Sequence, residues 1–147
     1  SPKPLRVFSV GTIAMHEGLA ACGDVDNGVA ICEFADGRVA CFYASRTMAH
    51  GHETATEVVG TDGRLVIGRD GRLNQVEIAD AHGIRTLTTP TFYERFADAF
   101  LREEMHFVDC VRFDRTPALT LHDASEATRI GIALRTSLSE RRVVDLG

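Results

Sequence analysis

The sequence predicts an α+β fold, with a broad, predominantly antiparallel (mixed) β-sheet and two main helices packed on one face. Two observations support this. In the first two thirds of the 147-residue chain, short apolar runs alternate with Gly-containing turns, as is typical of strands. In the last third, apolar residues recur at helical spacing. A run of strands followed by helices is typical of the α+β class.

The strands are expected to begin at Leu5 to Val10, followed by a loop from Thr12 to Gly23. A hairpin follows, because an Asp-Gly pair supplies the positive φ that tight hairpin turns need. It comprises Val29 to Phe34, Asp36-Gly37 and Val39 to Ala44. Further strands are expected at Thr54 to Val59, Arg64 to Ile67, Leu73 to Ala79, Ile84 to Thr88 and Val143 to Leu146, with another turn at Asp70-Gly71 between the second and third of these.

Two helices are expected after Pro90. Thr91 is the predicted N-cap of the first, and Glu94 three residues later completes a capping box. The second helix is expected to start near Asp123, a good N-cap residue. The apolar positions are Phe92, Phe96, Phe100, Phe107, Val108 and Val111 in the first helix, and Ala127, Ile130, Leu134 and Leu138 in the second.

Composition narrows the function classes. The net charge is −5, from 16 Lys and Arg against 21 Asp and Glu, and no basic stripe is present, so nucleic acid is not an expected partner. No apolar run approaches the ~20 residues of a membrane span, so no membrane partner is expected. The length predicts a single domain over 1–147. The start lacks both an initiator Met and an apolar signal core, so we expect the chain to be part of a longer protein.

The four cysteines form no CxxC pair and have no His at zinc-finger spacing. Cys32 and Cys41 lie in apolar strand-like runs, where a free Cys behaves as a small hydrophobic residue, so we expect them to be buried thiols. Metal or redox chemistry is the alternative. A reducing, cytoplasmic location follows from the absence of a disulfide framework.

Both faces of the central hairpin are apolar, although a half-solvated strand alternates apolar with polar residues. The helices can cover only one face of such a sheet. We therefore expect the other face to be covered by a second copy, giving a homodimer or homotetramer. The alternation leaves two candidate sets for the bare face, Ile31 with Cys41 or Cys32 with Phe42.

Catalytic motifs are absent from the sequence. It contains no GxGxxG, P-loop, GxSxG or HExxH, so no catalytic, cofactor-binding or metal site is predicted within the chain. Asp24 and Asp26 are expected to form turns and caps, with a catalytic carboxylate pair as the alternative.

The most informative polar stretch follows the hairpin. Arg46, His50 and His52 are the candidate substrate-binding residues, because a strand end that carries Arg and His can hold a polyol or an acid. The alternative is a solvated loop without function. Arg95 is expected to tie the first helix to the sheet. The remaining histidines are expected at the surface or in helix packing, namely His16, His82, His106 and His122.

These motifs together resemble the C-terminal domain of the Gfo/Idh/MocA oxidoreductases, closest to the inositol-dehydrogenase-like branch. They span almost the whole chain in family order. The matching pieces are Arg6-Val7-Phe8-Ser9-Val10-Gly11, Gly23-Asp24-Val25-Asp26-Asn27-Gly28 leading into Phe34-Ala35-Asp36-Gly37, Ala44-Ser45-Arg46 with His50-Gly51-His52, Glu57-Val58-Val59-Gly60-Thr61-Asp62-Gly63, Arg95-Phe96-Ala97-Asp98-Ala99-Phe100, and Asp123 after Thr116-Pro117 opening the helix that reaches Ser137.

The resemblance implies a larger enzyme whose N-terminal Rossmann domain binds NAD or NADP and whose catalytic Lys, Asp and His precede the first strand seen here. This chain would supply the sheet, part of a sugar or polyol pocket and the oligomer interface, and alone it is expected to be inactive and to bind no cofactor. His50 and His52 stand where the family often has aromatic residues around the Gly. The alternative is a non-catalytic binding or oligomerisation module of the same fold. A stand-alone hydrolase or lyase is disfavoured, because no nucleophile–base set is present.

Overall fold

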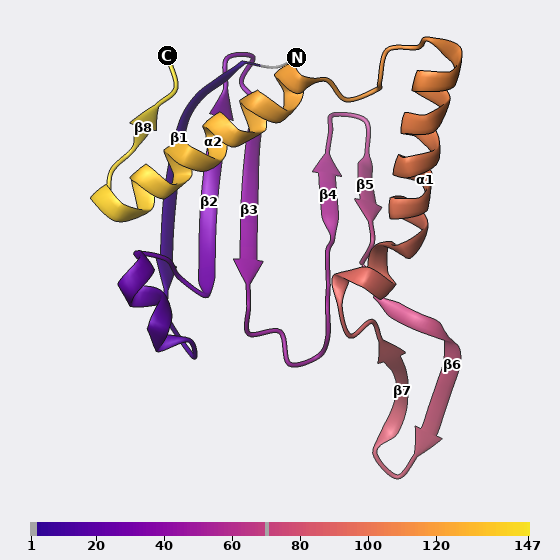
Figure 1. Cartoon of the computed structure of the whole chain (residues 1–147). Coiled ribbons are helices and arrows are strands. Elements are labelled where there is room, and N and C mark those ends of the chain that lie inside the picture. Colours follow the sequence, from indigo (N-terminus) through magenta and orange to yellow (C-terminus); the bar gives the residue numbers. More distant parts are fainter. Residues whose placement is uncertain (1–2, 70) are drawn as a thin grey trace. The chain divides into compact units, whose positions relative to one another are not determined.

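Residues 3–69 and 71–147 are described by the computed structural model, and they form the strands and helices of an α+β protein (Figure 1). The predicted class is therefore confirmed. The chain divides into a first unit, Ser1–Thr47 with Ala118–Gly147, and a second unit, Met48–Pro117, each described by itself below. Asp70, half of the predicted turn at Asp70-Gly71, lies outside the described residues.

The first unit contains a four-stranded antiparallel sheet in the order β3-β2-β1-β8. The strands are β1 (Pro4–Thr12), β2 (Asn27–Phe34), β3 (Val39–Ser45) and β8 (Val144–Asp145). The predicted hairpin is confirmed, since the Phe34 backbone N–H donates to the Arg38 carbonyl at 2.9 Å and Gly37 has a φ of 85°. All strand pairs in this sheet are antiparallel. In such a sheet, one face can pack against a helix while the other face stays exposed.

Helix α2 (Leu121–Glu140) packs against β1 and covers one face of this sheet (Figure 1). Val7, Cys32 and Ala133 form the buried core between helix and sheet. The helix starts two residues earlier than expected. Thr120 is its N-cap, and Asp123 is the third helical residue, whose carboxylate accepts from the Thr120 backbone N–H at 2.9 Å. The prediction of Asp123 as the N-cap was therefore wrong, because Asp123 is the second member of the capping box that Thr120 opens.

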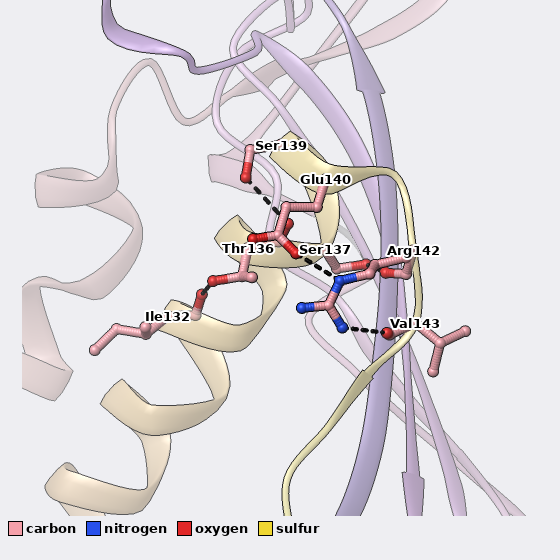
Figure 2. A network of polar contacts seen from close by, with 7 residues as sticks. All are labelled: Ile132, Thr136, Ser137, Ser139, Glu140, Arg142 and Val143. Atoms are coloured by element: carbon pink, nitrogen blue, oxygen red, sulfur yellow. Dashed lines mark hydrogen bonds and ion pairs between the residues drawn. The ribbon is translucent and has the colours of Figure 1, made fainter.

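A polar network fastens the end of α2 to the chain that leads into β8 (Figure 2). The fully buried Ser137 hydroxyl donates to the Arg142 carbonyl at 2.6 Å and accepts from the Ser9 backbone N–H on β1 at 3.0 Å. Arg142 pairs with Glu140 and donates to the Val143 carbonyl. One hydroxyl thus satisfies backbone groups from two elements, as a buried polar atom must.

The second unit contains two further two-stranded antiparallel sheets. One pairs β4 (Thr56–Val59) with β5 (Arg64–Ile67), and the other pairs β6 (Arg72–Asp80) with β7 (Gly83–Thr88). The described strands therefore form three sheets where the sequence suggested one broad sheet, and β5 does not pair with β6 across Asp70-Gly71. Alternation locates strands but does not specify their partners.

Helix α1 (Phe92–Phe113) completes the second unit. Its predicted capping box is confirmed: the Thr91 side chain accepts from the Tyr93 backbone N–H at 3.2 Å, and Glu94 accepts from the Thr91 backbone N–H at 3.1 Å. The helix bends near its start, where Phe96 has the non-helical angles φ −119° and ψ 17° (Figure 1). Of the two helices, only α2 belongs to the same unit as the four-stranded sheet.

Two smaller expectations need correction. The expected loop from Thr12 to Gly23 contains a 3₁₀ helix, η1 (Glu17–Cys22), which ends at Gly23 with a φ of 63°. Cys32 is buried as expected, but Cys41 is exposed because it points to the face opposite α2. No helix in the described part of the chain is long and apolar enough to cross a membrane.

Candidate functional site

The four-stranded sheet has one bare face, and the register identifies it. Cys32 is fully buried against α2, whereas its neighbour Ile31 is 41% exposed and pairs with Cys41 on β3. The structure therefore selects Ile31 with Cys41 from the two predicted sets. The apolar residues of this bare face are Phe8, Val10, Val29, Ile31, Val39, Cys41 and Tyr43.

Arg46 directly follows β3, and its backbone is held firmly to the start of β2. Its N–H donates to the Asp26 carbonyl at 2.7 Å. On either side, the Ser45 hydroxyl donates to Asn27 Oδ1 at 2.6 Å, and the Thr47 hydroxyl donates to the same oxygen at 3.2 Å. The side chain of Arg46 therefore projects from a fixed point, which a binding residue requires.

Asp26 organises the loop that faces Arg46. Asp26 is 2% exposed, and its carboxylate accepts hydrogen bonds from the backbone N–H groups of Ala14, Met15 and His16 at 2.8–2.9 Å. Burial raises the pKa of Asp26, but these bonds and one from the Asn27 amide outweigh it, so the pKa lies well below its ordinary value. Asp26 is therefore a structural anion, in agreement with the expected turn-forming role.

Asp24, in contrast, is exposed and pairs with Arg46 at 3.6 Å. His16, Gly18, Leu19 and Arg46 line an open hollow of about 390 Å³. A guanidinium beside a carboxylate offers donors and acceptors together, which matches the hydroxyl groups of a polyol. The Asp24 and Asp26 carboxylates do not form a catalytic pair, because Asp26 is fully occupied by loop N–H groups.

His50 and His52 lie in the segment before β4, in the second unit. The His50 side chain is 58% exposed, and its Nε2 contacts Glu53 Oε2 at 3.2 Å. The His50 carbonyl accepts a hydrogen bond from the Thr88 hydroxyl. The intervening Gly51 has a φ of 106°, and a Cβ there would lie 2.6 Å from the Thr88 hydroxyl and the Thr89 carbonyl oxygen. Only glycine fits this approach.

His52 is held more closely than His50. Its N–H donates to the Thr89 carbonyl at 2.7 Å, and its carbonyl accepts from the Thr89 hydroxyl at 2.9 Å. Its ring contacts the Phe92 and Phe96 rings edge-on, at centroid distances of 6.4 and 5.9 Å, and its Nε2 lies 3.1 Å from Thr54 Oγ1. We name these four residues, Thr54, Thr89, Phe92 and Phe96, the His52 clamp.

No pattern in the sequence indicates a functional role for the His52 clamp. Of its members, Thr54 alone is close to His52 in the sequence, two residues further on. Thr89 comes near His52 through hydrogen bonds between this segment and the end of β7, far along the chain, and Phe96 was interpreted as ordinary helix packing.

Arg95 lies against the turn after β5. Its Nη2 occupies the space beside Gly68 that an added Cβ would need, and its guanidinium stacks over the Phe96 ring at 5.1 Å. This agrees with the expectation that Arg95 ties α1 to the strands. Arg46 belongs to the first unit, whereas His50 and His52 belong to the second, so their convergence on one pocket stays a prediction.

Three comparisons relate the chain to known proteins. The model of a family described as the oxidoreductase family, C-terminal alpha/beta domain, matches residues 11–146. Among curated proteins, the scyllo-inositol 2-dehydrogenase (NAD(+)) of Bacillus subtilis is 36% identical over 136 residues, covering 92% of this chain and 40% of that protein. The myo-inositol 2-dehydrogenase of Thermotoga maritima is 31% identical over 142 residues, covering 96% of this chain and 42% of that protein.

Solved structures that are similar to this chain also include inositol dehydrogenases. The scyllo-inositol dehydrogenase from Lactobacillus casei with bound NAD(H) and scyllo-inositol superposes with a TM-score of 0.92 at 30% identity, covering 98% of this chain and 42% of the other. The myo-inositol 2-dehydrogenase from Lactobacillus plantarum gives 0.94 at 29% identity, covering 99% of this chain and 43% of the other. The chain thus spans about two fifths of the length of its relatives.

Proposed function

The chain belongs to the Gfo/Idh/MocA oxidoreductase family, through its C-terminal α/β domain, and from this premise we propose that it is the substrate-binding and oligomerisation domain of an NAD(P)-dependent dehydrogenase. The substrate is a sugar or polyol such as an inositol. The observation that carries the proposal is the fixed placement of the His52 ring in a chain whose solved relative binds NAD(H) and scyllo-inositol.

In this account Arg46, His50 and His52 hold the polyol. Guanidinium N–H groups donate to hydroxyl oxygens, and a neutral imidazole both donates and accepts. Asp24, beside Arg46, adds an acceptor. Several such bonds fix the orientation of a hydroxylated ring, which is what a binding domain must supply before hydride transfer.

The dinucleotide does not fit the residues of this chain. Phosphate binding uses the free backbone N–H groups of a helix N-terminus that follows a glycine-rich turn. Here both long helices begin with capping boxes, in which Glu94 and Asp123 place negative charge at that position. We therefore propose that NAD or NADP is held by a Rossmann domain outside this chain, and we assign the chain no step of the hydride transfer.

The bare face of the four-stranded sheet supports the oligomerisation half of the proposal. Contiguous exposed apolar patches of this kind usually mark interfaces. Burying ~800 Å² per protomer at ~25 cal/mol per Å² yields a gross gain well above the about 4–15 kcal/mol cost of association. A two-fold axis lets this face pack on itself, giving a dimer or, with a second axis, a tetramer. We also propose a cytoplasmic location, supported by four free thiols.

The bare face also favours a second candidate, a non-catalytic module of the same fold that only binds or oligomerises. An activity screen of the whole protein with scyllo-inositol, myo-inositol and hexoses, against both NAD and NADP, separates the two. We expect polyol-dependent reduction of one cofactor. Calorimetric titration of this chain alone with each cofactor should give no binding. A whole protein inert toward every polyol, or micromolar cofactor binding by this chain, would contradict the proposal.

A further inference from the structure

We propose that Thr54 is a positioning residue that fixes the orientation of the His52 imidazole, so that His52 meets the polyol through Nδ1. The inference rests on the proposed function, because it requires that His52 contacts substrate. Beyond the proposed function, the inference says that the Nδ1 atom of His52 contacts the polyol, and that the Thr54 hydroxyl determines this by holding Nε2.

The backbone of His52 is held by hydrogen bonds at both its N–H and its carbonyl. Two hydrogen bonds join His52 to Thr89, one in each direction, and Thr89 is itself 3% exposed and donates its N–H to the Gly71 carbonyl at 2.9 Å. Hydrogen bonds at both the N–H and the carbonyl of His52, the first to the Thr89 carbonyl and the second from the Thr89 side-chain hydroxyl, restrict the direction in which its Cβ points. The His52 side chain therefore leaves the backbone along a set direction.

The plane of the His52 ring is restricted by two aromatic contacts. The Phe92 and Phe96 rings contact the imidazole edge-on, at interplanar angles of 62° and 77°. Phe96 also marks the bend of α1, where its backbone leaves the helical region (Figure 1). Two aromatic contacts restrict the rotation of the imidazole about its side-chain bonds, since edge-to-face pairs depend on angle as well as distance.

The two nitrogen atoms of the His52 ring have different surroundings. Nε2 lies 3.1 Å from the Thr54 hydroxyl, and within the described residues Nδ1 has no hydrogen-bond partner. A threonine hydroxyl can donate or accept, so either neutral tautomer is accommodated. When Thr54 donates to Nε2, Nδ1 carries the proton and donates. When Thr54 accepts, Nδ1 accepts. A polyol hydroxyl is suited to both.

His50 provides the contrast. The His50 ring is more exposed, and its one described side-chain contact is with the exposed Glu53 carboxylate. No aromatic ring in the described residues contacts it. His52, whose ring is held in place, therefore orients the polyol and discriminates between its epimers. His50 does not have this role.

The test uses the whole protein with three substitutions at Thr54 and its neighbour. Thr54→Val keeps the shape but removes the hydroxyl, Thr54→Ser restores it, and Thr56→Val removes an exposed hydroxyl on β4 as the matched control. Thr54 is exposed, so none of these should prevent folding. Histidine side-chain ¹⁵N NMR reports the His52 tautomer ratio, and steady-state kinetics with scyllo-inositol and myo-inositol report binding.

We expect Thr54→Val to shift the His52 tautomer ratio, to raise KM for the preferred inositol about five-fold with kcat little changed, and to narrow the preference between the two epimers. Thr54→Ser should restore all three, and Thr56→Val should change none. If His52→Ala raises KM while Thr54→Val alters neither tautomer nor KM, the positioning role is wrong and the proposed function stands. If His52→Ala leaves KM unchanged, the assignment of His52 to the substrate site fails instead.

Discussion

His52 and Thr89 are joined by two hydrogen bonds, although 37 positions separate them in the sequence. The hydroxyl of Thr89 is the donor to the His52 carbonyl, and it is buried there with little access to water. This link connects the segment that carries both candidate histidines to the end of β7, the strand before α1.

Replacing Thr89 by valine should lower the free energy of unfolding by about 0.5–1.5 kcal/mol, because it removes the buried hydroxyl that donates to the His52 carbonyl. The matched control is Thr86→Val on β7, the strand that ends just before Thr89, because the Thr86 hydroxyl has no hydrogen bond among the described residues. Urea unfolding followed by circular dichroism measures both. Equal midpoints for the two variants would show that the Thr89 hydroxyl does not hold the segment.

Gly51→Ala should destabilise the second unit much more than Gly63→Ala. A Cβ at Gly51 would lie 2.6 Å from two oxygen-bearing groups on a backbone with φ of 106°, whereas a Cβ at Gly63 would meet no atom within 4 Å. We expect a cost above about 2 kcal/mol for the first, from strain and lost hydrogen bonds together, and within about 0.5 kcal/mol for the second. Thermal unfolding of the two variants side by side decides this.

Asp26 should make stability pH-dependent on the acid side. Because the folded state lowers its pKa, its contribution is complete above the ordinary carboxyl pKa of about 4 and is lost as the pH falls toward the folded value. Asp26→Asn should lower the melting temperature at neutral pH and flatten its decline below about pH 4. Asp24→Asn is the control, since that carboxylate is exposed. A wild-type acid profile in Asp26→Asn would contradict the role given to the buried carboxylate.

Ile31→Lys should dissociate the proposed oligomer, because it places a charge at the centre of the bare face of the four-stranded sheet. Ile84→Lys changes a residue that is even more exposed, but on β7 of the second unit, and should leave the assembly intact. Sedimentation velocity at tens of micromolar separates the species. A wild-type protein that is monomeric at that concentration would defeat the interface, whatever the variants do.

Structural features that depend on residues close together in the sequence could be predicted. The Asp36-Gly37 hairpin and the Thr91–Glu94 capping box depend on residues a few positions apart, and the structure confirms both. The position of Asp123 inside its own capping box shows the limit, because Thr120 and Asp123 are both good caps and only the backbone shows which is first.

Features that depend on distant pairing could not be predicted. Cys41 looked buried because its strand is apolar on both faces, and only the register with Ile31 shows that it faces away from α2. The His52 clamp is a similar case. Arg46, His50 and His52 could be nominated from residue type, but the contact of Thr89 with His52 joins residues 37 positions apart, which no local pattern indicates.

We propose that this chain binds the polyol and that the dinucleotide binds outside it. The most direct test measures KM for inositol and for NAD(P) separately in the whole protein, with wild type, His50→Ala and His52→Ala. We expect KM for inositol to rise about ten-fold in His52→Ala and less in His50→Ala, while KM for the cofactor stays unchanged in both. An unchanged KM for inositol, or an increase confined to the cofactor, would contradict it.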